Sequence, residues 1–116
     1  MKTEQIEING KLAVYHIGQN AADNFAAIDK SESAQDIWFH AEDSSSCHVV
    51  FIHSDKIWSK DEIRKIVKKG ALLCKQHTAK LKSEKKVNII YSTMENLTKC
   101  AQVGQVEVVN TKTIMV

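Results

Sequence analysis

The chain has 116 residues, of which 43% are hydrophobic and 26% are charged, and its formal net charge is +2. This length and this balance fit one globular domain with its own core, and they exclude a disordered tail and a fibrous protein. We therefore expect residues 1–116 to form a single domain.

The first segments predict a β-hairpin followed by a short helix. Residues 4–8 alternate polar and apolar side chains, Asn9-Gly10 follows, and residues 11–17 supply the return strand. Asn-Gly favours a type I′ hairpin turn, because both central residues of that turn need positive φ. Asn20 is a good helix N-cap, so we expect a helix over residues 21–30.

A second hairpin is predicted from two runs, residues 36–41 and 47–53, joined by an acidic, serine-rich loop. Side chains alternate along a strand, so residues two apart share a face. The hairpin would then bring four polar or aromatic side chains near one another: Asp36, Trp38, His40 and His48. This cluster is either a site or an unusually polar stretch of sheet.

The longest predicted helix begins with the capping-box pattern of Ser59 and Glu62. Apolar residues then recur from Ile63 to Leu81 at the spacing of one helix face. The other faces carry basic residues: Arg64, Lys65, Lys68, Lys69 and Lys75.

The C-terminal third predicts a buried strand at residues 87–91 and a short turn or helix near 94–97. A last hairpin is expected to join residues 105–109 to 112–116. Together these elements predict an α+β fold, with a largely antiparallel or mixed sheet of about six or seven strands and two main helices packed on it.

The small net charge hides a strong asymmetry along the chain. Residues 1–55 carry a net charge of −6, whereas residues 56–86 carry +8. A basic block of this density attracts phosphate backbones, although a solvated helix face explains many such blocks.

Metal binding and catalysis both find weak support. His40, Cys47, His48 and His53 lie close in sequence, but alternation puts at most two of them on one face, and a metal needs three or four ligands. Cys47 and His48 are strand neighbours that face opposite ways, so Cys47 is expected to be a small buried hydrophobe. Asp36 and His40 could pair, yet no serine or threonine is clearly placed beside them. We expect no metal, no cofactor and no enzymatic activity.

Nucleic-acid binding needs cations, stacking surfaces and hydrogen-bonding groups. The lysine block supplies the first, Trp38 is a candidate for the second, and Asn24, His40 and His48 are candidates for the third. A strand tryptophan is more often a core residue, and only one of sixteen basic residues is arginine, which argues against bidentate base reading.

The number and spacing of the cysteines indicate the redox state of the protein's compartment. Cys47, Cys74 and Cys100 are odd in number, widely spaced and without a C-x-x-C pair, which favours a reducing environment. No apolar run approaches the roughly 20 residues of a membrane helix. The N-terminus also lacks the apolar segment of a signal peptide, so we expect a cytosolic or nuclear protein and assign it to the cytoplasm.

Several motifs resemble the NFACT-R family, the RNA-binding module of proteins in ribosome-associated quality control. The matching stretches are Gly18–Asn24, Asp36–Asp43, His48–Val50, Ala71–Leu73, Val87–Tyr91, Asn96–Leu97, Val103–Val106 and Lys112–Ile114. Together they span roughly residues 11–116. The run D-x-W-F-H followed by H-V-V is the most distinctive part.

The resemblance implies a non-catalytic domain that binds tRNA or rRNA. It places the characteristic polar positions of the family at Gly18, Asn24, Asp36, Trp38, His40 and His48, with a late lysine at Lys99. We add Arg64, Lys68 and Lys75 of the basic helix as expected phosphate contacts.

The chain departs from the family pattern at Gln19 and Thr98, where relatives often carry lysine, and at Ser45–Cys47, where relatives carry small residues or Pro-Gly. Each lost lysine lowers the slope of log affinity for nucleic acid against log salt concentration by about one at most.

Two further partners and two alternative functions stay open. The ribosome is one expected partner, and DNA bound through the basic helix is another. The main alternative is an adaptor that docks on a ribosome-associated protein or another nucleic-acid-bound partner. A small hydrolase using Asp36 and His40 is the third reading.

Overall fold

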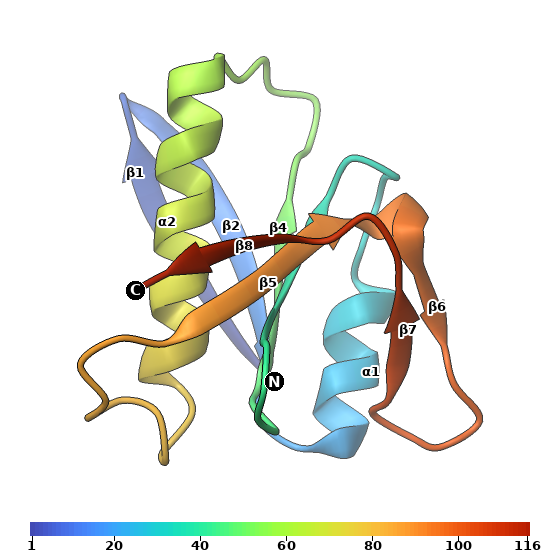
Figure 1. Ribbon diagram of the computed structural model, residues 1–116. Helices are drawn as coiled ribbons and strands as arrows, with labels where there is room; N and C mark the ends of the chain where they lie inside the picture. Colours follow the sequence, from blue (N-terminus) through green and yellow to red (C-terminus); the bar gives the residue numbers. More distant parts are fainter.

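The computed structural model describes residues 1–116 and contains two sheets and two α-helices (Figure 1). In chain order the elements are β1 (Lys2–Ile8), β2 (Lys11–Gly18), α1 (Ala21–Asp29), β3 (Ile37–Ala41), β4 (His48–Ile52), α2 (Lys60–Gln76), β5 (Asn88–Thr93), the 3-10 helix η1 (Met94–Asn96), β6 (Leu97–Lys99), β7 (Val106–Val108) and β8 (Lys112–Met115). Six strands form the main sheet in the order β1-β2-β4-β3-β5-β8, and β6 pairs with β7 in a small second sheet. Every neighbouring pair is antiparallel, which confirms the predicted α+β fold.

Both N-terminal hairpins form as predicted. Asn9 and Gly10 have φ values of 50° and 83°, as a type I′ turn requires. In the second hairpin Ile37 lies opposite Phe51. The side chain of Asn20 accepts a hydrogen bond from the backbone N–H of Asp23 and caps α1.

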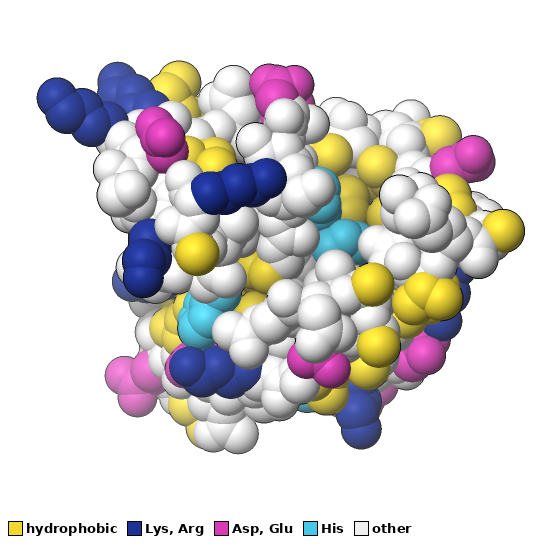
Figure 2. Space-filling model, turned by 90° about the horizontal axis from the view of Figure 1, so that it is seen from below, with side chains coloured by type: hydrophobic (Ala, Val, Ile, Leu, Met, Phe, Trp, Pro, Cys, Tyr) yellow, Lys and Arg dark blue, Asp and Glu magenta, His cyan; other side chains and the backbone are white.

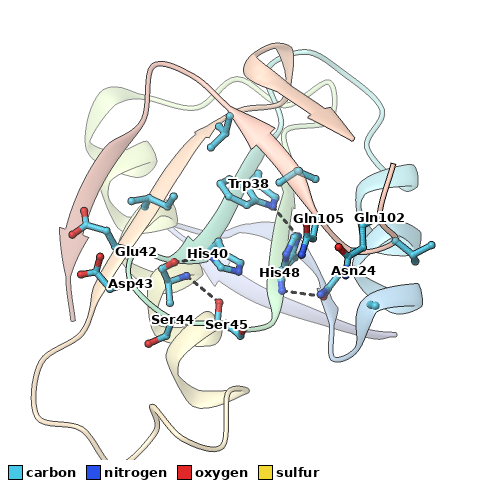
Figure 3. A pocket seen from close by; sticks show the side chains of 18 residues that line it. Asn24, Trp38, His40, Glu42, Asp43, Ser44, Ser45, His48, Gln102 and Gln105 are labelled. Carbon is cyan, nitrogen blue, oxygen red and sulfur yellow. Dashed lines mark hydrogen bonds between the residues drawn. The ribbon is translucent and has the colours of Figure 1, made fainter. Parts of the chain in front are cut away.

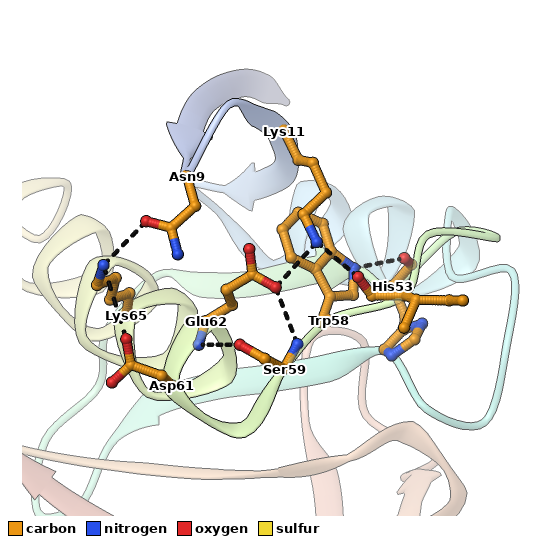
Figure 4. A network of polar contacts seen from close by, with 9 residues as sticks. Asn9, Lys11, His53, Trp58, Ser59, Asp61, Glu62 and Lys65 are labelled. Carbon is orange, nitrogen blue, oxygen red and sulfur yellow. Dashed lines mark hydrogen bonds and ion pairs between the residues drawn. The ribbon is translucent and has the colours of Figure 1, made fainter.

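The start of α2 is tied to β2 through a polar network (Figure 4). Ser59 Oγ accepts from the Glu62 N–H at 3.1 Å, and a Glu62 carboxylate oxygen accepts from the Ser59 N–H at 2.9 Å, so the capping box is complete. Lys11 donates to the same carboxylate at 2.9 Å. Its ammonium group and the capping N–H lower the pKa of Glu62 to about 2.

The helix ends earlier than its apolar spacing predicts. It stops at Gln76, and His77 caps it, whereas Leu81 lies in the turns that follow and is still buried. The apolar pattern extends to Leu81 because the turns after the helix pack on the same core. The helix itself does not continue that far.

The two helices lie on opposite faces of the main sheet (Figure 1). The face toward α2 buries the larger core, which includes Tyr15, Phe39 and Phe51. The face toward α1 buries a smaller cluster that contains Trp38 and Val50, and the side chains of β6 and β7 pack against it. This separation decides which predicted site residues can act together.

No helix of the structure is both long and apolar enough to cross a membrane.

The predicted last hairpin is wrong. Residues 106–108 pair with β6, and β8 pairs with β5. Ser92 donates to the carbonyls of Val109 and Asn110, at 3.1 and 3.3 Å, and so holds the point where the chain leaves one sheet for the other. The crossing buries apolar side chains of β7 on the α1 face and Ile114 of β8 on the α2 face, which a local hairpin would not do.

A pair of backbone hydrogen bonds extends the pairing of β5 with β8 beyond the ends of both strands. The Val87 N–H donates to the Val116 carbonyl at 2.7 Å, and the Val116 N–H donates back to Val87 at 2.9 Å. β8 is therefore firmly held on one side and is an edge strand on the other.

We expect Gly70→Ala to destabilise the fold. A Cβ at Gly70 would overlap the ring of Phe39, with three ring carbons no more than 2.8 Å away. Overpacking of this kind costs about 1–3 kcal/mol, which exceeds the gain of roughly 1 kcal/mol from replacing a helical glycine by alanine. Urea unfolding measures the difference, and Lys69→Ala on the exposed side of α2 is the control. A Gly70→Ala protein as stable as the control would contradict the close contact.

Candidate nucleic-acid interface

A cavity of about 690 Å³ opens on the α1 face of the main sheet. Its walls come from β3, β4, the first turn of α1, the loop between β3 and β4, and the loop between β6 and β7 (Figure 3). Four of the predicted residues line it: Asn24, Trp38, His40 and His48. We call this cavity the histidine pocket. Figure 2 looks toward this end of the molecule and shows histidine side chains in a hollow, with most Lys and Arg side chains farther out.

Trp38 forms a wall of the histidine pocket rather than an exposed platform. Its side chain is packed under α1, and the residue is only 2% exposed. The indole Nε1–H donates a hydrogen bond to Nδ1 of His48 at 3.1 Å. Because Nδ1 accepts this bond, the ring proton of His48 lies on Nε2.

His48 stays neutral at physiological pH. Burial, together with the smaller effect of the neighbouring His40, lowers its pKa to about 3. A neutral ring with an accepting Nδ1 leaves Nε2–H as a permanent donor in the pocket.

His40 has the opposite tautomer. Its Nδ1 lies 2.6 Å from the carbonyl oxygen of Ala41, and a carbonyl can only accept, so Nδ1–H donates. Burial lowers the pKa of His40, the hydrogen bond to Ala41 partly opposes this, and the charge of Lys80 lowers it again. The Nε2 atom of the neutral ring is therefore an acceptor.

The three rings form one aromatic cluster. His40 stacks on Trp38 with ring centroids 5.7 Å apart, and it meets His48 edge to face at 4.8 Å. The histidine pocket thus holds one fixed donor and one fixed acceptor on adjacent rings. A ligand with a complementary acceptor and donor side by side, such as the edge of a nucleobase, fits this arrangement.

Asn24 joins α1 to β4 at the same place. Its side-chain oxygen accepts from the backbone N–H of His48 at 3.2 Å, and its Nδ2 forms no hydrogen bond within the protein. Gly18 makes this approach possible, because a Cβ there would lie 2.6 Å from the Asn24 backbone. The role of Gly18 is to position Asn24.

Asp36 does not join this cluster, although alternation predicted that it would. It is fully buried just before β3, at the opposite end of the strand from His40. Its carboxylate accepts hydrogen bonds from Ser31 Oγ and from the backbone N–H groups of Glu32, Ser33 and His53, at 2.7 to 3.1 Å. The predicted proximity is therefore wrong, because these donors turn the side chain away into the loop before β3.

The basic residues of the helix are not close to the histidine pocket either. Arg64, Lys68 and Lys75 lie on α2, on the other face of the sheet. Lys99 is on the α1 face, but it pairs with Asp29 and sits 4.7 Å above the Phe25 ring. No lysine or arginine lines the histidine pocket, whereas Glu42 and Asp43 do.

Other polar groups of the pocket were not predicted. Gln102 and Gln105 come from the loop between β6 and β7, and Ser44 to Ser46 come from the loop before β4. The glutamines could not be found because the pairing of β6 with β7 was missed. The serines had a usable signal, since their loop joins the two strands that carry the histidines.

Asp36 and His40, the pair considered for hydrolysis, lie at opposite ends of β3. Cys47 points to the other face, as alternation predicted, and its buried thiol donates to the carbonyl of Cys74. No group of three or more His, Cys, Asp or Glu side chains lies close enough together to hold a metal ion.

A family model described as the NFACT protein RNA binding domain matches residues 6–110. The chain belongs to this family. The match confirms the resemblance seen in the motifs, and NFACT RNA-binding domains are a family of binding modules rather than enzymes.

A solved structure agrees with this assignment at the level of the fold. The C-terminal part of the fibronectin/fibrinogen-binding protein from Streptococcus suis is similar with a TM-score of 0.77 and 24% sequence identity, over 100% of this chain and 45% of that one. The chain thus spans less than half of that solved chain. No curated protein matches the sequence.

We expect Asp36→Asn to destabilise the protein. The amide replaces one accepting oxygen by a donor that faces the N–H groups of the loop. A buried donor left without a partner costs about 1–3 kcal/mol. Thermal or urea unfolding measures this loss, and unchanged stability would contradict the bonding pattern.

We also expect His48 to make the fold sensitive to acid. The folded-state pKa is about 3, below the ordinary value, so the unfolded chain binds a proton first as the pH falls. Stability is therefore full above about pH 6.5 and is lost toward the folded pKa, by at most about 1.4 kcal/mol per pH unit from this group. Urea unfolding between these limits should show a shallower pH slope for His48→Asn, whose side-chain oxygen can still accept from Trp38. Equal pH slopes for the protein and His48→Asn would contradict the lowered pKa of His48.

Proposed function

We propose that this chain binds RNA by taking an unpaired base into the histidine pocket. The RNA is tRNA or rRNA, the setting is ribosome-associated quality control in the cytoplasm, and residues 1–116 act as one non-catalytic domain. The observation that carries this proposal is the fixed donor and acceptor on His48 and His40 in a chain of the NFACT RNA-binding family.

The shape of the site favours a single nucleotide over a duplex. Proteins that read RNA by sequence mostly bind loops and ends, where bases are splayed out and their edges are free. The histidine pocket is large enough to enclose a base and offers further hydrogen-bonding groups from Asn24, Gln102 and Gln105.

The charges of the pocket support the same assignment. Both histidines are neutral, the lining contains no lysine or arginine, and it does contain Glu42 and Asp43, so the pocket suits an uncharged base better than a phosphate. Lys80 lies near enough to influence His40, and we assign it the phosphate beside the bound base.

The residues expected to bind RNA then divide by role. His40, His48 and Asn24 contact the base, whereas Trp38 and Gly18 position them. Asp36 keeps the start of β3 in place. Lys99 is held by Asp29, so its contribution to phosphate binding is smaller than the family position suggests.

Fluorescence anisotropy with labelled tRNA at low salt tests the proposal. His40→Ala should weaken binding about tenfold, since a stacked and hydrogen-bonded base contributes about 1–3 kcal/mol. His53→Ala is the matched control, because it removes a histidine just beyond β4, whose ring contacts Phe51 on the α2 side of the sheet.

Two outcomes would count against it. Absence of tRNA or rRNA-fragment binding at low salt would exclude RNA as the ligand. Equal affinities for His40→Ala and His53→Ala would exclude the histidine pocket. An RNA hairpin should also compete better than a blunt RNA duplex, since only the hairpin offers unpaired bases.

A further inference from the structure

A second cavity, of about 740 Å³, lies on the opposite face of the main sheet. It opens between the first half of α2 and the strands β5 and β8. Its floor is apolar and consists of Ile37, Ile63, Val67, Tyr91 and Ile114.

The rim of this cavity is basic and carries no acidic residue. Arg64, Lys68 and Lys112 line it. Arg64 has only a loose contact with the exposed Asp61, at 3.9 Å, and neither Lys68 nor Lys112 forms an ion pair. An occupant must therefore combine an apolar group with negative charge.

The free edge of β8 borders the same cavity. Hydrogen-bonded pairs alternate along an antiparallel ladder, and Val87 with Val116 is such a pair. By this alternation Ile114 and Lys112 bond to β5, while the N–H and C=O groups of Thr113 and Met115 point outward. An edge of this kind can accept another strand.

Cations of α2 follow this edge. Arg64 and Lys68 are one helical turn apart, and Lys75 lies two turns farther on the same side, where it donates to the Val116 carbonyl at 3.3 Å. Strand-pairing groups, an apolar floor and a row of positive charge are thus adjacent.

We propose that this face binds an extended acidic peptide with a large apolar side chain. Its main chain pairs with Thr113 and Met115, its apolar side chain enters the cavity beside Ile114, and its carboxylates face Lys68 and Lys112. Peptide fits better than RNA, because the floor is aliphatic apart from Tyr91 and the strand edge offers main-chain pairing. This site goes beyond the RNA-binding proposal and lies on the other face of the sheet.

The probe is a fluorescein-labelled peptide with the repeat Glu-Ser-Leu-Ser-Glu, which places Glu, Leu and Glu on one side of an extended chain. Replacing Glu by Gln, or Leu by Ser, should weaken its binding. Lys68→Glu combined with Lys112→Glu should weaken it about tenfold at low salt. The matched control, Lys69→Glu with Lys82→Glu, makes the same charge change outside the cavity and should have a small effect.

Met115→Pro tests the strand edge itself. It removes an N–H that β5 does not use, and proline is tolerated at such edge positions. Peptide affinity should fall about fivefold, the loss expected for one hydrogen bond. Thermal unfolding verifies that the variant is folded, and Met115→Ala serves as the reference.

Several results would overturn the proposal. These are no peptide binding at low salt, equal losses in the two double variants, or unchanged affinity in a folded Met115→Pro protein. Displacement of the peptide by single-stranded RNA that itself loses affinity on Lys68→Glu with Lys112→Glu would assign the face to RNA. A dimer that Met115→Pro dissociates would assign it to a second copy of the chain. None of these results changes the comparison of His40→Ala with His53→Ala.

Discussion

The hydrogen bond from the Trp38 indole to His48 sets the chemistry of the histidine pocket. It explains why a large amphipathic ring occupies a buried strand position, since the indole fills space under α1 and uses its one donor. It also determines which nitrogen of His48 carries the proton. Asn24 completes the arrangement by binding the backbone of the same residue, and Gly18 lets Asn24 come close enough. The polar character of the pocket therefore rests on a buried contact that a ligand does not touch.

The main sheet separates two surfaces of different chemistry. The α1 face offers a pocket with directed hydrogen-bonding groups and with two acidic residues, Glu42 and Asp43, in its lining. The α2 face offers an apolar cavity with lysines around it and a free strand edge beside it. Because the two openings lie on opposite faces, the proposed RNA base and the proposed acidic peptide would not compete for one site. The basic residues Arg64 and Lys68 of α2 thus belong to a different surface from the histidines of the pocket.

Local signals in the sequence predicted most of the fold. Asn9-Gly10 and the capping box at Ser59 each determine geometry within a few residues, so both were predicted correctly. The pairing of β7 with β6 was missed because it depends on which face of a distant sheet buries the side chains. Asp36 was misplaced for a similar reason, since backbone donors in the preceding loop outweigh strand alternation. His40 and His48 were correctly grouped because they lie on one hairpin. The face of the sheet on which α2 packs could not be predicted, because no local sequence signal determines it.

The position of β8 in the chain has a consequence for synthesis on the ribosome. β5 is made well before β8, and the bonds between Val87 and Val116 form only after residue 116 has left the exit tunnel. Until then β5, which pairs with β3 on one side, is an unpaired edge on the other and carries the apolar side chain of Ile89. Growing chains with such edges are prone to pair with one another. The nascent domain is thus most vulnerable to misassembly between the emergence of β5 and that of β8 from the tunnel, and a pause in that interval would prolong the exposure of β5.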